Sequence, residues 1–296
     1  MTKNKTINIG AHSAQFADLN VKGEQMKIDG ESFYKISNVN GMRPFFMSIV
    51  SHSNHWMFIS STGGLSAGRK DCDSALFPYY TDDKITDSFE TTGSKSIFLV
   101  EKNSQTFLWE PFSMRHVSLY KISRNLYKNA FGNKVIFEEI NHDLEVSFTY
   151  EWNSTDRYGF VRKSLLSNAG TSGVKVQFID GIQNVLPCGI ERALQNSTSN
   201  LVDAYKRTEL VAGSSLAVFA LSAIIVDKAE PSEALKSNVA WSLGLDNPTI
   251  LLSSLQLDTF RRGQQVSQET DVKAEKGAYF LNSEVSLEPQ QSKEWL

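Results

Sequence analysis

The residues best suited to binding chemistry gather in one short stretch, between residues 56 and 83. This stretch combines flat aromatic faces, a guanidinium and carboxylates, which are groups that pack on sugar rings and hydrogen-bond to hydroxyls. We interpret it as a candidate carbohydrate-contacting surface; the alternative is a polar loop anchored between strands by apolar neighbours. The candidate residues are Trp56, Arg69, Asp71, Asp73 and Tyr79.

A second pair of candidates, Asp180 and Asn184, lies in the run 178–190, which leads from an extended segment into a helical one. Gly181 between them favours a tight turn, and Asp and Asn side chains commonly bond to turn amides. The two residues are therefore candidates for contacting a ligand, and a purely structural role in the turn explains them equally well.

Several classes of site are not indicated by the sequence. His52 and His55 lie three residues apart on or beside a strand, with no third ligand close in sequence, so we expect no metal site. The chain has no Gly-x-Ser-x-Gly elbow, Walker loop or dinucleotide-binding motif, so we expect no cofactor and can assign no catalytic residue.

Charge and hydropathy limit the partners. The 30 basic and 33 acidic residues give a formal charge of −3, and no basic stripe is present, which argues against nucleic acid as a partner. The longest apolar run, 216–226, is far shorter than the roughly 20 residues of a membrane span. The first ten residues lack the apolar core of a signal peptide, which favours a cytoplasmic location.

The elements that must position the candidates are mostly strands. Short extended runs separated by turn residues fill 24–124, and Val146, Phe148, Tyr150 and Trp152 share one face of a later strand. Apolar residues at helical spacing predict one long helix over 190–205. The pattern predicts an all-β fold with one central helix and short helices or loops near the C-terminus. Residues 1–20 form an N-terminal segment for which the sequence allows either an ordered or a disordered state.

Five stretches carry a family resemblance: 56–69, 75–79, 158–162, 179–187 and 199–205. In these the chain resembles the N-terminal β domain of large carbohydrate-active enzymes similar to cellobiose phosphorylases and related glycoside hydrolases. The resemblance covers most of residues 20–290. It implies an antiparallel β super-sandwich of the galactose mutarotase-like type over 21–290.

The resemblance also implies that this domain supports an enzyme's function but does not itself catalyse the reaction. In that family a general acid in a following (α/α)6 barrel performs the reaction, and no such barrel is present in these 296 residues. We therefore expect a non-catalytic domain that supports substrate binding or dimerisation, with carbohydrate, an (α/α)6 catalytic domain of the same polypeptide and a second copy as partners. The alternatives are a stand-alone mutarotase-like aldose epimerase, which needs a histidine and a carboxylate converging in a cleft, and a lectin-like binding module.

The last residues, 291–296, include the apolar pair Trp295 and Leu296. Natural chain ends are usually polar and loosely held. We therefore expect this segment to begin a linker to an absent helical catalytic domain, in a chain truncated there. The alternative is that Trp295 and Leu296 fold back onto the sandwich as a C-terminal strand.

Overall fold

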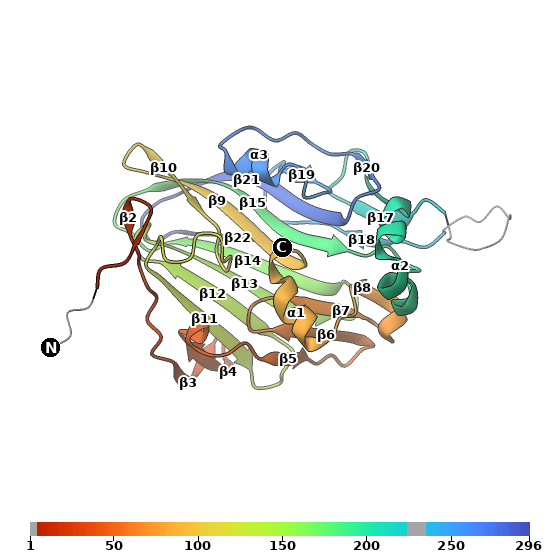
Figure 1. Cartoon of the computed structure of the whole chain (residues 1–296), viewed down its shortest axis with the longest axis horizontal. Coiled ribbons are helices and arrows are strands. Elements are labelled where there is room, and N and C mark those ends of the chain that lie inside the picture. Colours follow the sequence, from red (N-terminus) through yellow and green to blue (C-terminus); the bar gives the residue numbers. More distant parts are fainter. Residues whose placement is uncertain (1–4, 224–234) are drawn as a thin grey trace.

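The computed structural model describes residues 5–223 and 235–296, and strands dominate it (Figure 1). The larger of two main sheets has seven strands in the order β22-β14-β13-β12-β11-β4-β3. All pairs in it are antiparallel. Its strands are β3 (Lys22–Ile28), β4 (Glu31–Ser37), β11 (Ile122–Asn129), β12 (Val135–Asn141), β13 (Val146–Thr155), β14 (Gly159–Asn168) and β22 (Ser292–Trp295).

The second main sheet has five strands in the order β10-β9-β15-β21-β19, again antiparallel throughout. The longest, β15 (Val174–Val185), is hydrogen-bonded on both sides, by β9 and β21. The remaining strands of this sheet are β9 (Gly93–Lys102), β10 (Gln105–Trp109), β19 (Thr249–Leu251) and β21 (Gly277–Leu287).

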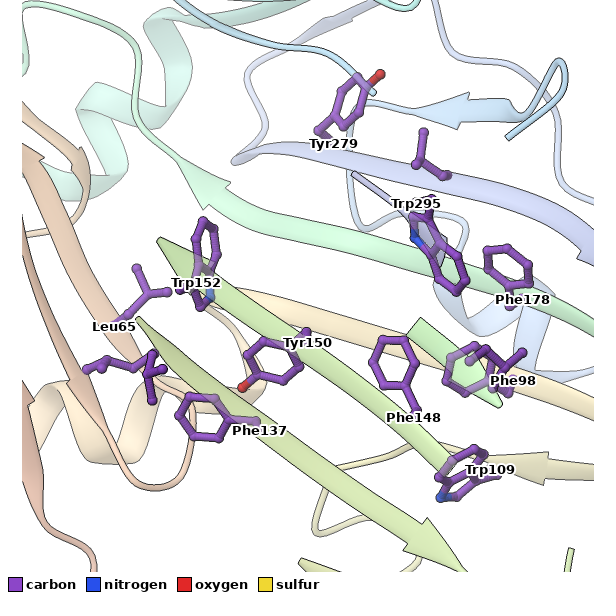
Figure 2. Packing of buried hydrophobic residues seen from close by; sticks show 14 of the residues in the cluster. Leu65, Phe98, Trp109, Phe137, Phe148, Tyr150, Trp152, Phe178, Tyr279 and Trp295 are labelled. Atoms are coloured by element: carbon purple, nitrogen blue, oxygen red, sulfur yellow. The ribbon is translucent and has the colours of Figure 1, made fainter. Parts of the chain in front are cut away.

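The core of the protein lies between these two sheets. Phe98 and Phe178 of the five-stranded sheet contact Phe148 and Trp295 of the seven-stranded one, with ring centroids 4.9 Å apart for Phe98–Phe148 and 4.8 Å for Phe178–Trp295 (Figure 2). The fold is therefore an all-β sandwich, as the period-two pattern predicted. The face of β13 predicted from alternation is confirmed, because Val146, Phe148, Tyr150 and Trp152 are all buried.

Two four-stranded sheets and a hairpin complete the strands. The first small sheet, in the order β5-β6-β7-β8, contains β5 (Phe46–Ile49), β6 (His55–Ser60), β7 (Leu65–Arg69) and β8 (Ala75–Phe77). The second has the order β18-β17-β16-β20 and contains β16 (Lys206–Leu210), β17 (Ala217–Leu221), β18 (Asn238–Ala240) and β20 (Asp271–Lys273). Near the N-terminus, β1 (Asn8–Ile9) and β2 (His12–Ser13) form an exposed hairpin, so the described part of 1–20 is not structureless.

In the part of the chain that the structure describes, helices are few and short. The long helix predicted over 190–205 is α2 (Arg192–Tyr205), which begins two residues later than expected. It packs at one end of the sandwich beside β8 and β17, where Val202 joins Ala75 and Leu221 in a small apolar cluster (Figure 1). The other helical elements are α1 (Asp82–Asp87), α3 (Leu257–Arg261) and the 3-10 turns η1 (Val39–Gly41), η2 (Cys72–Ser74) and η3 (Ser88–Glu90).

The end of the described chain differs from our expectation of a linker. Residues Ser292–Trp295 form β22, which pairs with β14 at the edge of the seven-stranded sheet. Trp295 is 2% exposed and its ring stacks on Phe178 (Figure 2). The linker expectation for 291–296 is wrong, because this indole has a packing site in the core; the alternative, a strand folded back onto the sandwich, is what the structure contains.

Candidate functional site

The candidates between residues 56 and 83 lie together around the small sheet β5–β8. Trp56 is on β6, and its cross-strand partner on the neighbouring β7 is Gly68. The indole of Trp56 lies over this glycine. A Cβ on Gly68 would lie 2.6 Å from Cζ2 of Trp56, so only glycine leaves room for the ring. The indole nitrogen of Trp56 donates a hydrogen bond of 3.1 Å to the carbonyl oxygen of Asp71.

Trp56 belongs to a row of four aromatic rings that we call the aromatic row: Phe46, Phe58, Trp56 and Tyr79. Phe46 and Phe58 are stacked with centroids 5.4 Å apart, Phe58 and Trp56 are 5.7 Å apart, and Tyr79 meets Trp56 edge-on at 5.5 Å. Strand alternation produces the row, because the intervening residues on β5 and β6 point into the core. Phe46 and Phe58 were not among the predicted site residues, although alternation along 45–60 was a signal for them.

The two ends of the aromatic row differ in exposure. Trp56 and Tyr79 are half-buried because they pack against the apolar cluster under α2, which includes Ile190. Phe46, at the other end on the edge strand β5, is 44% exposed. A ligand could therefore reach ring faces most easily at the Phe46 end.

The polar candidates near Trp56 divide into surface and structural residues. Arg69 and Asp71 are exposed, and the Arg69 Nε donates to Oδ1 of Asn54 at 3.1 Å. Asp71 also accepts a hydrogen bond from the amide of Asp73. The Asp73 carboxylate accepts one of 2.9 Å from the amide of Arg192, the first residue of α2, so Asp73 holds the start of that helix against the sheet.

Asp180 is remote from this surface, and the structure contradicts a role for it as an accessible ligand. It is 0% exposed, in the core between the two main sheets. Arg162 binds it in a bidentate manner at 2.7 and 2.9 Å, and three further donors fill its remaining acceptor positions: Ser96, Ser164 and Trp295. A carboxylate accepts about four hydrogen bonds, so none is left for a sugar hydroxyl.

Asn184 is also structural, and the expected turn at 180–184 is absent. The strand β15 continues through it to Val185, with a bulge between Gln183 and Val185. Asn184 occupies this bulge with a positive φ of 59° and donates to the hydroxyl of Thr92 at 2.9 Å. Gly181 is not needed for a turn. It is needed because the neighbouring strand is too close for a side chain: a Cβ on Gly181 would lie 2.0 Å from the carbonyl oxygen of Tyr279.

A second buried ionic cluster, which we did not predict from the sequence, lies under α3. The Glu110 carboxylate is fully buried between Arg261, at 2.9 and 2.8 Å, and Lys95, at 3.1 Å. Lys95 also pairs with Glu90 at 2.6 Å. Burial alone would raise the pKa of Glu110, but the hydrogen bond from Arg261 and the charge of Lys95 outweigh it and hold that pKa below its ordinary value.

Two histidine–carboxylate pairs bear on the epimerase alternative. His52 Nε2 lies 2.7 Å from the Asp156 carboxylate, but both side chains are open to solvent, at 79% and 61% exposure. His116 Nε2 lies 3.4 Å from Glu110, whose carboxylate is already closed off by Arg261 and Lys95. Neither pair therefore presents a histidine and a free carboxylate to a shared cleft, which is the geometry that proton transfer at a sugar carbon or oxygen requires.

Within residues 5–223 and 235–296, no cluster of three or more His, Cys, Asp or Glu side chains has the arrangement of a metal site. Over the same residues, no helix has the length and hydropathy needed to cross a bilayer. Comparison with known protein families and with characterised proteins gives no match to this chain.

Proposed function

We propose that this chain is the non-catalytic β-sandwich domain of a carbohydrate-active enzyme of the glycoside phosphorylase or hydrolase type, and that it contacts sugar through the aromatic row. The observation that carries the proposal is the row itself, in which four rings from three segments form one continuous line on the outer side of a four-stranded sheet. The sequence resemblance described above supports the same function.

The chemistry of the row suits a sugar chain. An aromatic face and the apolar face of a sugar ring both leave water when they stack, which is favourable by roughly 25 cal/mol per Å² of apolar surface. Phe46 provides the most exposed ring of the row. Near Trp56 lie two exposed charged residues, Arg69, which pairs across the strands with the neighbouring His55, and Asp71, whose backbone carbonyl accepts the hydrogen bond from the indole. Such charged groups form the stronger hydrogen bonds to hydroxyls.

The proposal includes the partners and the location that the resemblance implies. An (α/α)6 catalytic domain of the same polypeptide performs the reaction, the sandwich contributes to sugar binding or to a homodimer, and the protein acts in the cytoplasm. Asp180 and Asn184 hold the sandwich together and take no part in binding.

Binding of neutral gluco-oligosaccharides by the purified chain, measured by isothermal titration calorimetry, tests the proposal. Phe46→Ala should weaken binding about tenfold or more, because it removes most of an aromatic contact of roughly 1.5–3 kcal/mol. Phe16→Ala is the matched control, since Phe16 is 66% exposed and follows the β1–β2 hairpin, away from the sheet β5–β8. Equal affinities for the two variants would remove the aromatic row from the binding surface.

Activity assays distinguish the proposed function from the epimerase and lectin-like alternatives. The isolated chain should catalyse neither phosphorolysis nor hydrolysis of oligosaccharides, and it should not accelerate the interconversion of glucose or galactose anomers. Robust turnover in the last assay, abolished by His116→Ala, would establish the epimerase alternative. Sugar binding by a full-length protein that has no catalytic domain would establish the lectin-like one.

A further inference from the structure

A groove of about 750 Å³ lies between the edge strand β5 and the strands β3, β4 and β11. This volume is within the range of about 300–1,000 Å³ that is usual for ligand sites. The floor is apolar and consists of Ile36, Phe45, Met47 and Leu126. Met26 and Phe33 also line the groove, but by strand alternation their side chains lie on the opposite face of the sheet from Ile36 and Leu126. The exposed rings of Tyr34 and Phe46 stand at its sides.

One wall of the groove is a sheet edge that is open at Phe46 and Ser48 and ends two residues later, where the amide of Val50 donates to the carbonyl of Gly132 at 2.9 Å. Strand β5 is the outermost strand of its sheet, and among the strands of residues 5–223 and 235–296 it pairs only with β6. The amide of Ser61 bonds to the carbonyl of Phe45 at 2.8 Å, so the alternation of an antiparallel ladder directs the backbone groups of Phe46 and Ser48 away from β6. Along the described chain, the carbonyl of Ser48 is bonded to Nζ of Lys128 at 2.8 Å, and no backbone partner beyond β6 bonds to Phe46.

The charged lining of the groove has one sign. Lys27 and Lys128 line it, and none of the aspartates and glutamates that the structure describes does. The nearest acidic side chain linked to a lining residue is Glu31, which contacts Asn129 and is already paired with Lys134 at 2.6 Å. An occupant that carries negative charge therefore meets two ammonium groups without a competing carboxylate in the lining.

We propose that this groove binds an extended peptide segment with alternating apolar and acidic side chains, which adds a strand to the open edge of β5. The backbone of the segment pairs with Phe46 and Ser48, and its apolar side chains enter the floor. Its carboxylates pair with Lys27 and with Lys128, which gives up its bond to the carbonyl of Ser48. Strand addition of this kind combines main-chain pairing for affinity with alternate side chains for specificity.

The apolar floor favours a peptide over a sugar chain at this place. Hydroxyl groups pressed against Ile36, Met47 and Leu126 would lose their hydration without gaining a partner, which is unfavourable. Apolar side chains of a peptide have no such loss. Methionine is also common at peptide-binding surfaces because its flexible side chain adapts to different partners, and Met47 is part of the floor. This inference does not depend on the proposed function.

A dye-labelled synthetic heptapeptide with alternating Asp or Glu and Val, Ile or Phe is the probe, and fluorescence anisotropy with the full 296-residue chain is the measurement. We expect saturable binding that weakens at least tenfold in the double variant Lys27→Glu/Lys128→Glu. The double variant Lys121→Glu/Lys236→Glu has the same change in net charge at exposed lysines outside the groove, and its affinity should stay within twofold of the original. Equal losses in the two double variants would overturn the proposal.

Backbone pairing is tested without altering the protein. Two versions of the peptide carry N-methyl groups on alternate residues, one set on the odd positions and one on the even positions. Only one set faces β5, so one peptide should lose at least tenfold in affinity while the other binds unchanged, and amide NMR signals of Phe46 and Ser48 should shift with the binding peptide.

Three results would refute the strand addition: equal binding of both methylated peptides, equal binding of a peptide with lysine in place of its acidic residues, or no peptide binding. Gluco-oligosaccharides that shift the signals of Met47 and Leu126 would then assign the groove to carbohydrate. Concentration-dependent dimerisation that is lost in Lys128→Glu would instead assign the β5 edge to a second copy of the chain.

Discussion

At the scale of single residues, the charges that matter most to this fold are the ones farthest from solvent. Asp180 is surrounded by Arg162, two serines and the indole of Trp295, which come from three strands, β9, β14 and β22. Replacing it by alanine leaves the Arg162 guanidinium buried at 9% exposure without a counter-charge. Removing one partner of a buried pair is strongly unfavourable, whereas replacing both partners by apolar groups is often tolerated.

We therefore predict that Asp180→Ala lowers the free energy of unfolding by about 3–5 kcal/mol, measured by urea denaturation. The exposed Asp156 is the control, and its replacement by alanine should cost at most about 1 kcal/mol. The double variant Arg162→Met/Asp180→Leu should recover a large part of the loss. A double variant that is less stable than Asp180→Ala would show that the network has a role beyond charge compensation.

The lowered pKa of Glu110 leads to a prediction about how the free energy of unfolding depends on pH in acid. Its pKa is below the ordinary value of 4.5 in the folded protein, since Arg261 and Lys95 favour its ionised form over the opposing effect of burial. A carboxyl group with a lowered pKa contributes stability above its unfolded-state pKa and loses that contribution as the pH falls through the folded-state value. The pKa of Glu90 is lowered too, because burial, which would raise it, is outweighed by the charge of Lys95 together with hydrogen bonds from Lys95, Met114 and Ser113.

Glu110→Gln should therefore be less stable than the unmodified chain at pH 7, by about 3–5 kcal/mol. The difference between the two proteins should stay constant down to about pH 5 and shrink below about pH 4.5, as measured by urea denaturation at a series of pH values. Glu101→Gln, at an exposed site, should change stability by less than about 0.5 kcal/mol. A difference that grows toward low pH would contradict this account.

At the scale of elements, the strands that alternate clearly could be predicted, and the long-range pairings could not. Alternation correctly placed one face of β13 in the core, and a 3.6-residue period located α2. The bulge at Asn184 and the Asp180 network were missed, because β15 is hydrogen-bonded on both sides and its sequence does not reveal which strands supply the partners. Phe46 could have been found by alternation, whereas its stacking on Phe58 depends on the pairing of β5 with β6.

The short strand β22 shows the same limit, since its partner β14 is more than a hundred residues away in the chain. We predict that Trp295→Ala lowers the free energy of unfolding by about 3–5 kcal/mol, because it leaves a cavity beside Phe178 and removes a hydrogen bond to Asp180. Leu296 is 42% exposed, so Leu296→Ala should cost less than about 1 kcal/mol in the same denaturation experiment. Equal effects of the two substitutions would mean that β22 does not pack in solution as described here.

At the scale of the whole molecule, one apolar core joins the two main sheets and the sheet β5–β8. The same cluster contains Ile59 of β6, Phe148 of β13 and Phe178 of β15. Figure 2 shows Phe148 and Phe178 within it, and a second, smaller cluster that includes Phe280 covers the other face of the five-stranded sheet under α3. Sheets that share a core lose their packing together, and the described sandwich should therefore unfold as one cooperative unit.

Two spectroscopic probes measure this cooperativity at different places. Far-UV circular dichroism reports the strands of all the sheets, and tryptophan fluorescence is dominated by the core, because Trp109, Trp152 and Trp295 are each 2% exposed. The two urea transitions should have the same midpoint, and Asp180→Ala should shift both by the same amount because its network links the two main sheets. If the fluorescence transition of Asp180→Ala came at lower urea than the loss of strand signal, the core would separate before the sheets do. The sandwich would then consist of layers that are stable on their own, contrary to the shared packing of Phe98, Phe148 and Trp295.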